Sequence, residues 1–525
     1  MMRRTVELLA RFPPALTRIT NILVILLSLW LISNHHHAQA ADPVTSSGLH
    51  THVNLSAISP TEKTQYDITG GTRPGGGTNL FHSFGDFNVP TNNIANFLNG
   101  VSFDVNGNPL PTGLQTTNIL GRVTGGNISD IFGTIQTSGF RNANLFLMNP
   151  AGFIFGPNAT VNVGGMMTFT TANHLKLADN LLFNAVPDVA TDALLSASPV
   201  AAFGFIGSNP HAIDFKGGQL SVVNGTGITL VGGDINFVPD PISGTPSSIT
   251  ASGKQIRLTS VSGTGQVSVE TAVPEPDIAL GNITLGQGTL LSTVSDLSLG
   301  SRSGGSVSIR GGQLVTMGTT IDTRTDSTGG NSGAITLATN GSLSLTDSII
   351  STSSSSSGNG GAVTVTGMDV TMDRVKIITD VSSTPGLGPD MVRPGAVTVT
   401  AQNSVTISGL GPDDPIITTV ATGTLLDAGP VKISGKTVNL SNGLIDATIS
   451  VSGIISPGNG GTIEIRGNNI NSTQFKLTSI ASGISESSGT GGNILLRGVD
   501  NIRADNIQLT ASNVNVNASD RKSVV

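Results

Sequence analysis

The chain has 525 residues, of which 67 are Gly, and only 11% of its residues are charged. Soluble domains typically contain about 25% charged residues, so this composition argues against an ordinary α/β enzyme. The 26 Lys and Arg and the 33 Asp and Glu give a formal charge of −7, and the absence of a long basic run excludes nucleic acid as an expected partner. The chain contains no Cys, which excludes disulfides and Cys-based zinc sites, while its 37% of hydrophobic residues can form a core.

The first 40 residues show the three regions of a secretory signal peptide. Several arginines precede an apolar stretch from Ile22 to Ile32, and Ala38-Gln39-Ala40 then supplies an A-x-A cleavage pattern. The apolar stretch is shorter than the roughly 20 residues that cross a bilayer, so cleavage is favoured over a membrane anchor. We therefore expect a signal peptide over residues 1–40 and a mature chain that begins near Ala41.

The next part of the chain, from about residue 50 to residue 170, is unusually rich in Phe. Eleven of the 18 Phe lie in it, which predicts a thicker hydrophobic core than in the rest of the chain. His82 stands beside Phe81 and Phe84 without a second His or a carboxylate next to it, so we expect a packed core residue rather than a metal ligand.

Residues 144–165 read as three short strands separated by two turns. The first turn is Asn149-Pro150-Ala151-Gly152, with Asn, Pro and Gly at the positions that favour a type I turn. Ala151 at the third position is compatible with type I and disfavours type II, because type II needs a positive φ there.

At these residues the sequence resembles the two-partner-secretion domain of the filamentous haemagglutinin family. The match is to the family's N-P-N-G region, whose second Asn is replaced here by Ala151, as in the cyanobacterial branch. The resemblance implies a right-handed parallel β-helix, export by an outer-membrane barrel transporter, and a role of Asn149, Pro150 and Gly152 in recognition by that transporter. It covers roughly residues 50–175, and the other matching stretches are Gly70–Thr72, Asn79–Phe84, Gly121–Gly126 and Gly133–Gln136.

From about residue 300 a repeat is visible in which a Gly precedes alternating apolar residues, as in Gly333-Ala334-Ile335-Thr336-Leu337. A period of 20 to 50 residues is typical of a solenoid or an array. The seven repeat glycines have successive spacings of 28, 28, 34, 34, 32 and 31 residues; they are Gly305, Gly333, Gly361, Gly395, Gly429, Gly461 and Gly492.

Each repeat contains three candidate strands, which together predict one coil of an all-β parallel β-helix. After Gly333 these strands centre on Ile335 and Leu337, then Leu343 and Leu345, then Ile349 and Ile350. We expect the repeat glycines to mark coil corners where the backbone is left-handed or strained. Because an unpaired strand edge can pair with another chain and cause aggregation, we also expect the N-terminal module to cap the first coil.

The enzyme alternative is a β-helical polysaccharide lyase or glycosidase, which needs clustered carboxyl groups. Asp322, Asp347, Asp373 and Asp446 lie near third strands of their coils and could align on one face. A charged outer file explains such an arrangement more simply. We therefore predict no catalytic residues, no cofactor and no bound metal, and no enzymatic activity.

The sequence as a whole predicts three regions: the signal peptide at 1–40, a two-partner-secretion (haemagglutination activity) domain at 41–190, and a β-helical repeat region at 191–525. The expected function is that of a secreted adhesin or surface structural protein, located outside the cell or on its surface. Expected partners are the barrel transporter and a surface glycan or protein of a host or neighbouring cell.

Overall fold

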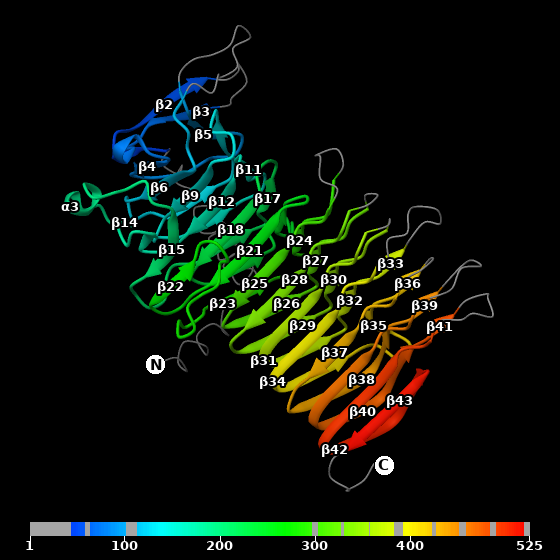
Figure 1. Cartoon of the computed structure of the whole chain (residues 1–525). Coiled ribbons are helices and arrows are strands. Elements are labelled where there is room, and N and C mark those ends of the chain that lie inside the picture. Colours follow the sequence, from blue (N-terminus) through cyan, green and yellow to red (C-terminus); the bar gives the residue numbers. More distant parts are fainter. Residues whose placement is uncertain are drawn as a thin grey trace, which may run out of the picture. The chain divides into compact units, whose positions relative to one another are not determined.

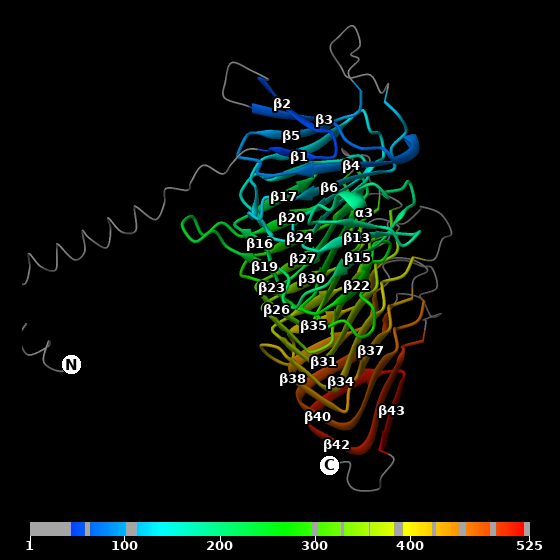
Figure 2. The same cartoon turned by 90° about the vertical axis from the view of Figure 1, so that its left-hand side faces the viewer.

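The computed structural model describes residues 44–57, 64–100, 113–296, 303–326, 330–355, 358–382, 392–422, 427–450, 458–482 and 490–518. The expected signal peptide and the cleavage site before Ala41 lie outside these residues. These described residues belong to one compact unit, in which a 35-stranded sheet winds through successive coils (Figures 1 and 2).

Each coil contributes one strand or strand segment to each of three faces, and on every face the neighbours along the stack are parallel. A single coil shows the order: β25 (Val307–Gly311) on the first face, β26 (Gln313–Met317) on the second and β27 (Thr320–Asp322) on the third. The predicted three strands after Gly333 are confirmed as β28 (Ile335–Thr339), β29 (Ser342–Thr346) and β30 (Ile349–Ser351).

The first-face strands that come before β25 are, in stacking order, β4 (Asn79–Phe84), β6 (Asn118–Val123), β9 (Asn144–Met148), β12 (Met166–Thr170), β18 (Gly227–Gly232) and β21 (Gln255–Ser260). Those that come after β28 are β31 (Val363–Asp373), β34 (Val397–Ser408), β37 (Val431–Ser434), β40 (Ile463–Ser479), β42 (Asn493–Ala511) and β43 (Asn513–Ala518). The second face is made of β7 (Ser129–Ile131), β10 (Phe153–Phe155), β16 (Ile213–Lys216), β19 (Ile235–Val238), β23 (Asn282–Leu285), β26, β29, later parts of β31 and β34, β38 (Thr437–Asp446), and parts of β40 and β42. The third face is made of β3 (Thr64–Gly70), β5 (Ile94–Leu98), β8 (Thr134–Ser138), β11 (Thr160–Asn162), β17 (Gln219–Val222), β20 (Ser248–Thr250), β24 (Leu290–Ser292), β27, β30, β32 (Lys376–Ile378), β35 (Pro415–Thr418), and the last parts of β38, β40 and β42.

The core is a set of apolar files that run along the stack, as the period-2 alternation predicts. In β31, Val363 and Val365 are buried while Thr364 and Thr366 are partly exposed. Val363 lies in register with Ile335 of the coil before it and Val397 of the coil after it. Each inward residue therefore stacks on its counterparts in the neighbouring coils.

The expectation that the repeat glycines adopt left-handed backbone is wrong. None of the seven has a φ between +20° and +160°. Gly is needed instead because coils approach closely: a Cβ on Gly333 would lie 1.6 Å from the carbonyl oxygen of Gly305, and one on Gly361 would lie 1.9 Å from that of Gly333. In the described residues from β23 onward, the positive φ angles occur at a different corner, between the second and third faces, at Gly288, Gly318, Asp347, Arg374, Asn442, Gln474 and Asn506.

A ladder of buried hydroxyl groups holds the glycine corner together. In five successive coils, the residue that directly follows the third strand donates its side-chain hydroxyl to the carbonyl oxygen of the next repeat Gly. The pairs are Thr293–Gly305 (2.8 Å), Thr323–Gly333 (2.6 Å), Thr352–Gly361 (2.5 Å), Thr379–Gly395 (2.8 Å) and Thr419–Gly429 (2.7 Å). Each of these Thr is fully buried, so its hydroxyl is satisfied within the corner.

Two short strands cover the first coil, as the exposed edge of a β-helix requires. β1 (Ser46–Gly48) pairs antiparallel with β4, and β2 (Thr51–Ala57) pairs antiparallel with β3. A single-turn 3₁₀ helix, η2 (Pro74–Gly76), connects β3 to β4.

Two smaller sheets lie outside the coils. The first is antiparallel and consists of β13 (His174–Leu177), β14 (Leu182–Asn184), β15 (Val200–Phe205) and β22 (Gly265–Ser268), with the short helix α3 (Val189–Asp192) between β14 and β15. The second is parallel and consists of β33 (Val381–Ser382), β36 (Ala421–Thr422), β39 (Ile449–Ser450) and β41 (Ala481–Ser482).

Candidate secretion-recognition site

The predicted Asn149–Gly152 turn connects β9 on the first face to β10 on the second. The amide of Gly152 donates to the carbonyl oxygen of Asn149 (3.0 Å), which closes the turn. The amide of Ala151 donates to Asn149 Oδ1 (2.9 Å), and Ala151 does not have a positive φ. These contacts agree with the type I geometry that the residue types indicate.

The side chain of Asn149 is buried and makes its hydrogen bonds within the protein. Asn149 is only 1% exposed, and its Nδ2 donates to the carbonyl oxygen of Asn127 and to Ser129 Oγ, both at 2.9 Å. These bonds connect the turn to the preceding coil, so the buried Asn149 side chain stabilises the conformation of the turn. Pro150 and Ala151 are partly exposed and form the accessible part of the turn.

Both the backbone conformation and the lack of space at position 152 require Gly. Its φ is +104°, which side chains with a Cβ rarely adopt, and a Cβ would lie 2.7 Å from the carbonyl oxygen of Ala212. Any other residue at this position would therefore push the turn away from the following coil.

The accessible part of the turn borders a groove of about 440 Å³. Asn173, which precedes β13, and Pro210 and His211, which precede β16, line it together with Pro150 and Ala151. Loops from several coils thus gather around the turn.

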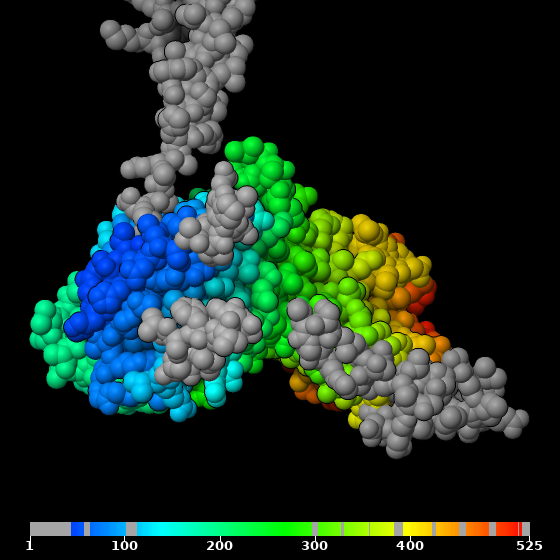
Figure 3. Space-filling model, turned by 90° about the horizontal axis from the view of Figure 1, so that it is seen from above, coloured from blue at the N-terminus to red at the C-terminus, as the bar shows by residue number. Residues whose placement is uncertain are grey.

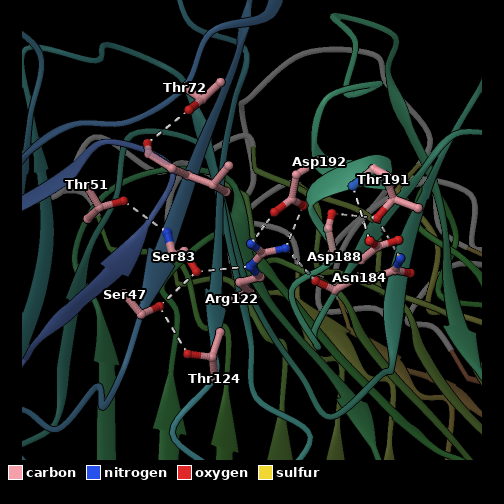
Figure 4. A network of polar contacts seen from close by, with 12 residues as sticks. Ser47, Thr51, Thr72, Ser83, Arg122, Thr124, Asn184, Asp188, Thr191 and Asp192 are labelled. Carbon is pink, nitrogen blue, oxygen red and sulfur yellow. Dashed lines mark hydrogen bonds and ion pairs between the residues drawn. The ribbon is translucent and has the colours of Figure 1, made fainter.

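A second polar cluster, which the sequence did not indicate, centres on Arg122 of β6 (Figure 4). Arg122 is 2% exposed, and its guanidinium makes two bonds to the carboxylate of Asp192 in α3, at 2.8 and 2.6 Å. It also donates to Ser83 Oγ (3.0 Å) and to the carbonyl oxygen of Asn184 (3.1 Å). In the sequence, Arg122 lies in the matching stretch Gly121–Gly126, but nothing there indicates its partners.

The Phe-rich region contains two cores, which confirms the expectation of a thicker core. The antiparallel sheet packs Leu175, Phe183 and Phe203 onto the outward side chains of the first face, including Phe81 and Phe146. Phe81 and Phe183 meet edge to face at 5.0 Å. All six residues of β4 are buried because one core lies on each side of that strand.

His82 is packed in this region, as predicted. Its ring lies near those of Phe84 and Phe97, with centroids 6.0 and 5.6 Å away. Burial, with a smaller contribution from the charge of Arg73, lowers the pKa of His82 to about 3. The imidazole is therefore neutral in the folded protein at ordinary pH.

Comparison with protein families matches residues 44–274 to the TPS secretion domain. The chain is a two-partner-secretion exoprotein. It is similar in structure to the HMW1 secretion domain from Haemophilus influenzae, at 13% identity and a TM-score of 0.38 over 90% of this chain and 100% of that chain. It is also similar to a filamentous hemagglutinin secretion domain, at 16% identity and a TM-score of 0.31 over 70% and 100% of the two chains. No curated protein matches the sequence.

The exoprotein accordingly has an outer-membrane transporter as its partner and is exported across the outer membrane. The family match covers the capped first coils, the Asn149–Gly152 turn, the Arg122 cluster and the whole antiparallel sheet. The predicted domain boundary at residue 190 falls within α3 and stays a prediction. Within the described residues, none of the helices has the length and apolar character needed to cross a bilayer.

The four aspartates considered for catalysis do not share one face of the exoprotein. Asp322 and Asp446 lie in the same file of the third face but four rungs apart. Burial raises the pKa of both. Asp347 and Asp373 lie at the corner between the second and third faces, where both pair with Arg374, and the hydrogen bond from Arg374 lowers the pKa of Asp347.

Proposed function

We propose that the exoprotein is a non-enzymatic adhesin or structural rod, located outside the cell or on its surface, whose turn at Asn149–Gly152 is presented to the transporter. The proposed role in export rests on the observation that different residues of the turn have different tasks. Asn149 and Gly152 hold its shape from inside, and Pro150 and Ala151 occupy the accessible side next to a groove. We infer that the transporter reads this shape rather than the Asn149 amide.

The outer surface of the repeats supports the rod. On the second face, Asn471 Nδ2 donates to Asn439 Oδ1 (2.8 Å), and Asn439 Nδ2 donates to Thr406 Oγ1 (3.3 Å). Such polar files, repeated from coil to coil, give a long and mostly uncharged surface. A surface glycan or protein of a host or neighbouring cell is the kind of ligand that this surface would take.

The enzyme alternative gains no support from the aspartates that suggested it. Glycoside hydrolysis needs two carboxyl groups on either side of one bond. The pair at the corner, Asp347 and Asp373, shares a single arginine, and Asp322 forms an ion pair with Arg324. These contacts are those of structural carboxylates.

The export role is tested by changing the accessible side of the turn. Ala151→Arg should leave the fold intact, because Ala151 is partly exposed and keeps its backbone bond to Asn149. We expect at least a tenfold loss of surface delivery and accumulation in the periplasm, measured by protease accessibility on intact cells. Asn149→Ala and Gly152→Ala should also leave the chain in the periplasm. Both variants should in addition lower the melting temperature of the protein, because they disturb the turn itself.

The matched control is Pro157→Arg, in the neighbouring turn between β10 and β11, where Pro157 is exposed. This variant should be exported like the wild type. Undiminished surface delivery of Ala151→Arg would refute the recognition role of the turn.

A further inference from the structure

A groove with a positively charged lining lies at the corner between the first and second faces of the coils that contain β37, β40 and β42. Its volume is about 500 Å³. These coils lie toward the orange and red end of the stack, away from the secretion domain (Figures 1 and 3). Lys436, Arg466 and Arg497 line the groove, and none of the described residues that line it is acidic. Since the whole chain has a formal charge of −7, the groove is a local concentration of positive charge.

The two arginines of the groove continue a file of hydroxyl side chains on the outside of the first face. Thr366, Thr400 and Ser434 lie in register in successive coils, and Arg466 and Arg497 occupy the same position in the next two coils. All five residues alternate with buried apolar residues, so their side chains lie on the outer surface. We call these five residues the hydroxyl–arginine file. Hydroxyl groups can both donate to and accept from the hydroxyl groups of a sugar, and guanidinium groups bind carboxylates.

The positive charges of the groove are only partly balanced within the protein. Arg466 and Arg497 are in register on neighbouring strands, where like charges repel. Among the described residues, Glu464 is the only acidic partner of either arginine: it accepts from Arg466 Nε at 2.6 Å, and Arg497 Nε lies 3.4 Å from the same oxygen. Lys436 Nζ contacts the neutral amide of Asn403 at 3.4 Å. One carboxylate therefore faces three cations, and an external anion would complete the charge balance.

We propose that the groove and the hydroxyl–arginine file bind a polysaccharide that carries carboxylate groups. This rests on the proposed function, because it names the class of surface glycan that the exoprotein would bind. Glu464 contacts both guanidinium groups, so a carboxylate fits their positions, and the planar fork of an arginine matches the two oxygens of such a group. The side chains of Arg466 and Arg497 are 51% and 53% exposed, which leaves them accessible to a ligand. The hydroxyl groups that continue the file along the stack favour a sugar polymer over a small anion.

The experiment measures binding of the purified mature chain to polygalacturonate at low and at moderate ionic strength. The groove variant, Lys436→Gln with Arg497→Gln, removes two positive charges and keeps the ion pair between Arg466 and Glu464. Its melting temperature should be unchanged, whereas its binding should be about tenfold weaker or more and should depend less on salt. The matched control, Lys216→Gln with Arg393→Gln, removes the same charge from exposed positions outside the groove and should bind like the wild type.

Equal binding by the wild type and the groove variant would overturn the inference, and so would an equal loss in both variants, which would indicate attraction by net charge alone. Dextran sulfate and uncharged dextran are measured in the same way. Tighter binding of either polymer than of polygalacturonate would overturn the assignment to carboxylate groups. A wild type that binds none of the three polymers would overturn the inference and leave a structural rod. Release of reducing ends from polygalacturonate would instead overturn the proposed non-enzymatic function.

Discussion

Replacing Gly361 with alanine should open the β-helix at one corner and cost roughly 3 kcal/mol of stability. The new Cβ would lie 1.9 Å from the carbonyl oxygen of Gly333, far inside any contact that real Cβ atoms make. The corner cannot relax freely, because the carbonyl oxygen of Gly361 accepts from buried Thr352 (2.5 Å) and the coil above stacks on it. Hydrogen exchange should show loss of amide protection in β28, β31 and β34.

The loss should stay local, since each coil of a solenoid contacts mainly its neighbours. Protection in β9 and β12 of the secretion domain should be unchanged. Gly411→Ala is the matched control: Gly411 does not have a left-handed φ, and a Cβ there meets no atom within 4 Å. Similar behaviour of the two variants would show that the corners are not closely stacked.

Val363→Asp should be the most damaging single change in the repeats, with an expected cost of roughly 4–6 kcal/mol. Val363 is fully buried between Ile335 and Val397, so a carboxyl group there meets no water and no partner. Burial would raise its pKa, so the folded state would bind a proton more tightly than the unfolded state. The variant should therefore be least unstable at low pH and lose stability as pH rises through neutrality.

Thr364→Asp is the control on the outer side of the same strand. Thr364 is partly exposed, so its replacement should change stability by about 0.5 kcal/mol or less. Thermal melting and hydrogen exchange at pH 4.5 and pH 7.5 measure both effects. Equal costs at the two positions would contradict the inward and outward alternation of β31.

Much of the fold follows from local pattern. The three strands after Gly333 could be predicted because alternation, turn residues and spacing act within one repeat. The reason for the repeat glycines could not, since the atom that excludes a Cβ on Gly361 belongs to Gly333, one coil away. The hydroxyl ladder has the same origin: Thr352 follows β30 in the chain but bonds across the corner to Gly361.

In the candidate site, too, some features could be predicted from local sequence and others could not. The turn at Asn149 could be predicted because Asn, Pro and Gly specify its geometry locally. The Arg122 cluster could not, because Asp192 is 70 residues away in the sequence and only the folded coils bring the two together. The burial of Asn149 was also hidden, since its partner Ser129 belongs to the preceding coil.

Comparing surface delivery with and without the transporter is the most direct test of export by two-partner secretion. Cells that produce the exoprotein and its outer-membrane transporter are compared with cells that lack the transporter, and protease accessibility on intact cells reports the exported fraction. Delivery should require the transporter, and the chain should accumulate in the periplasm without it. Equal surface delivery in both strains would contradict export by two-partner secretion.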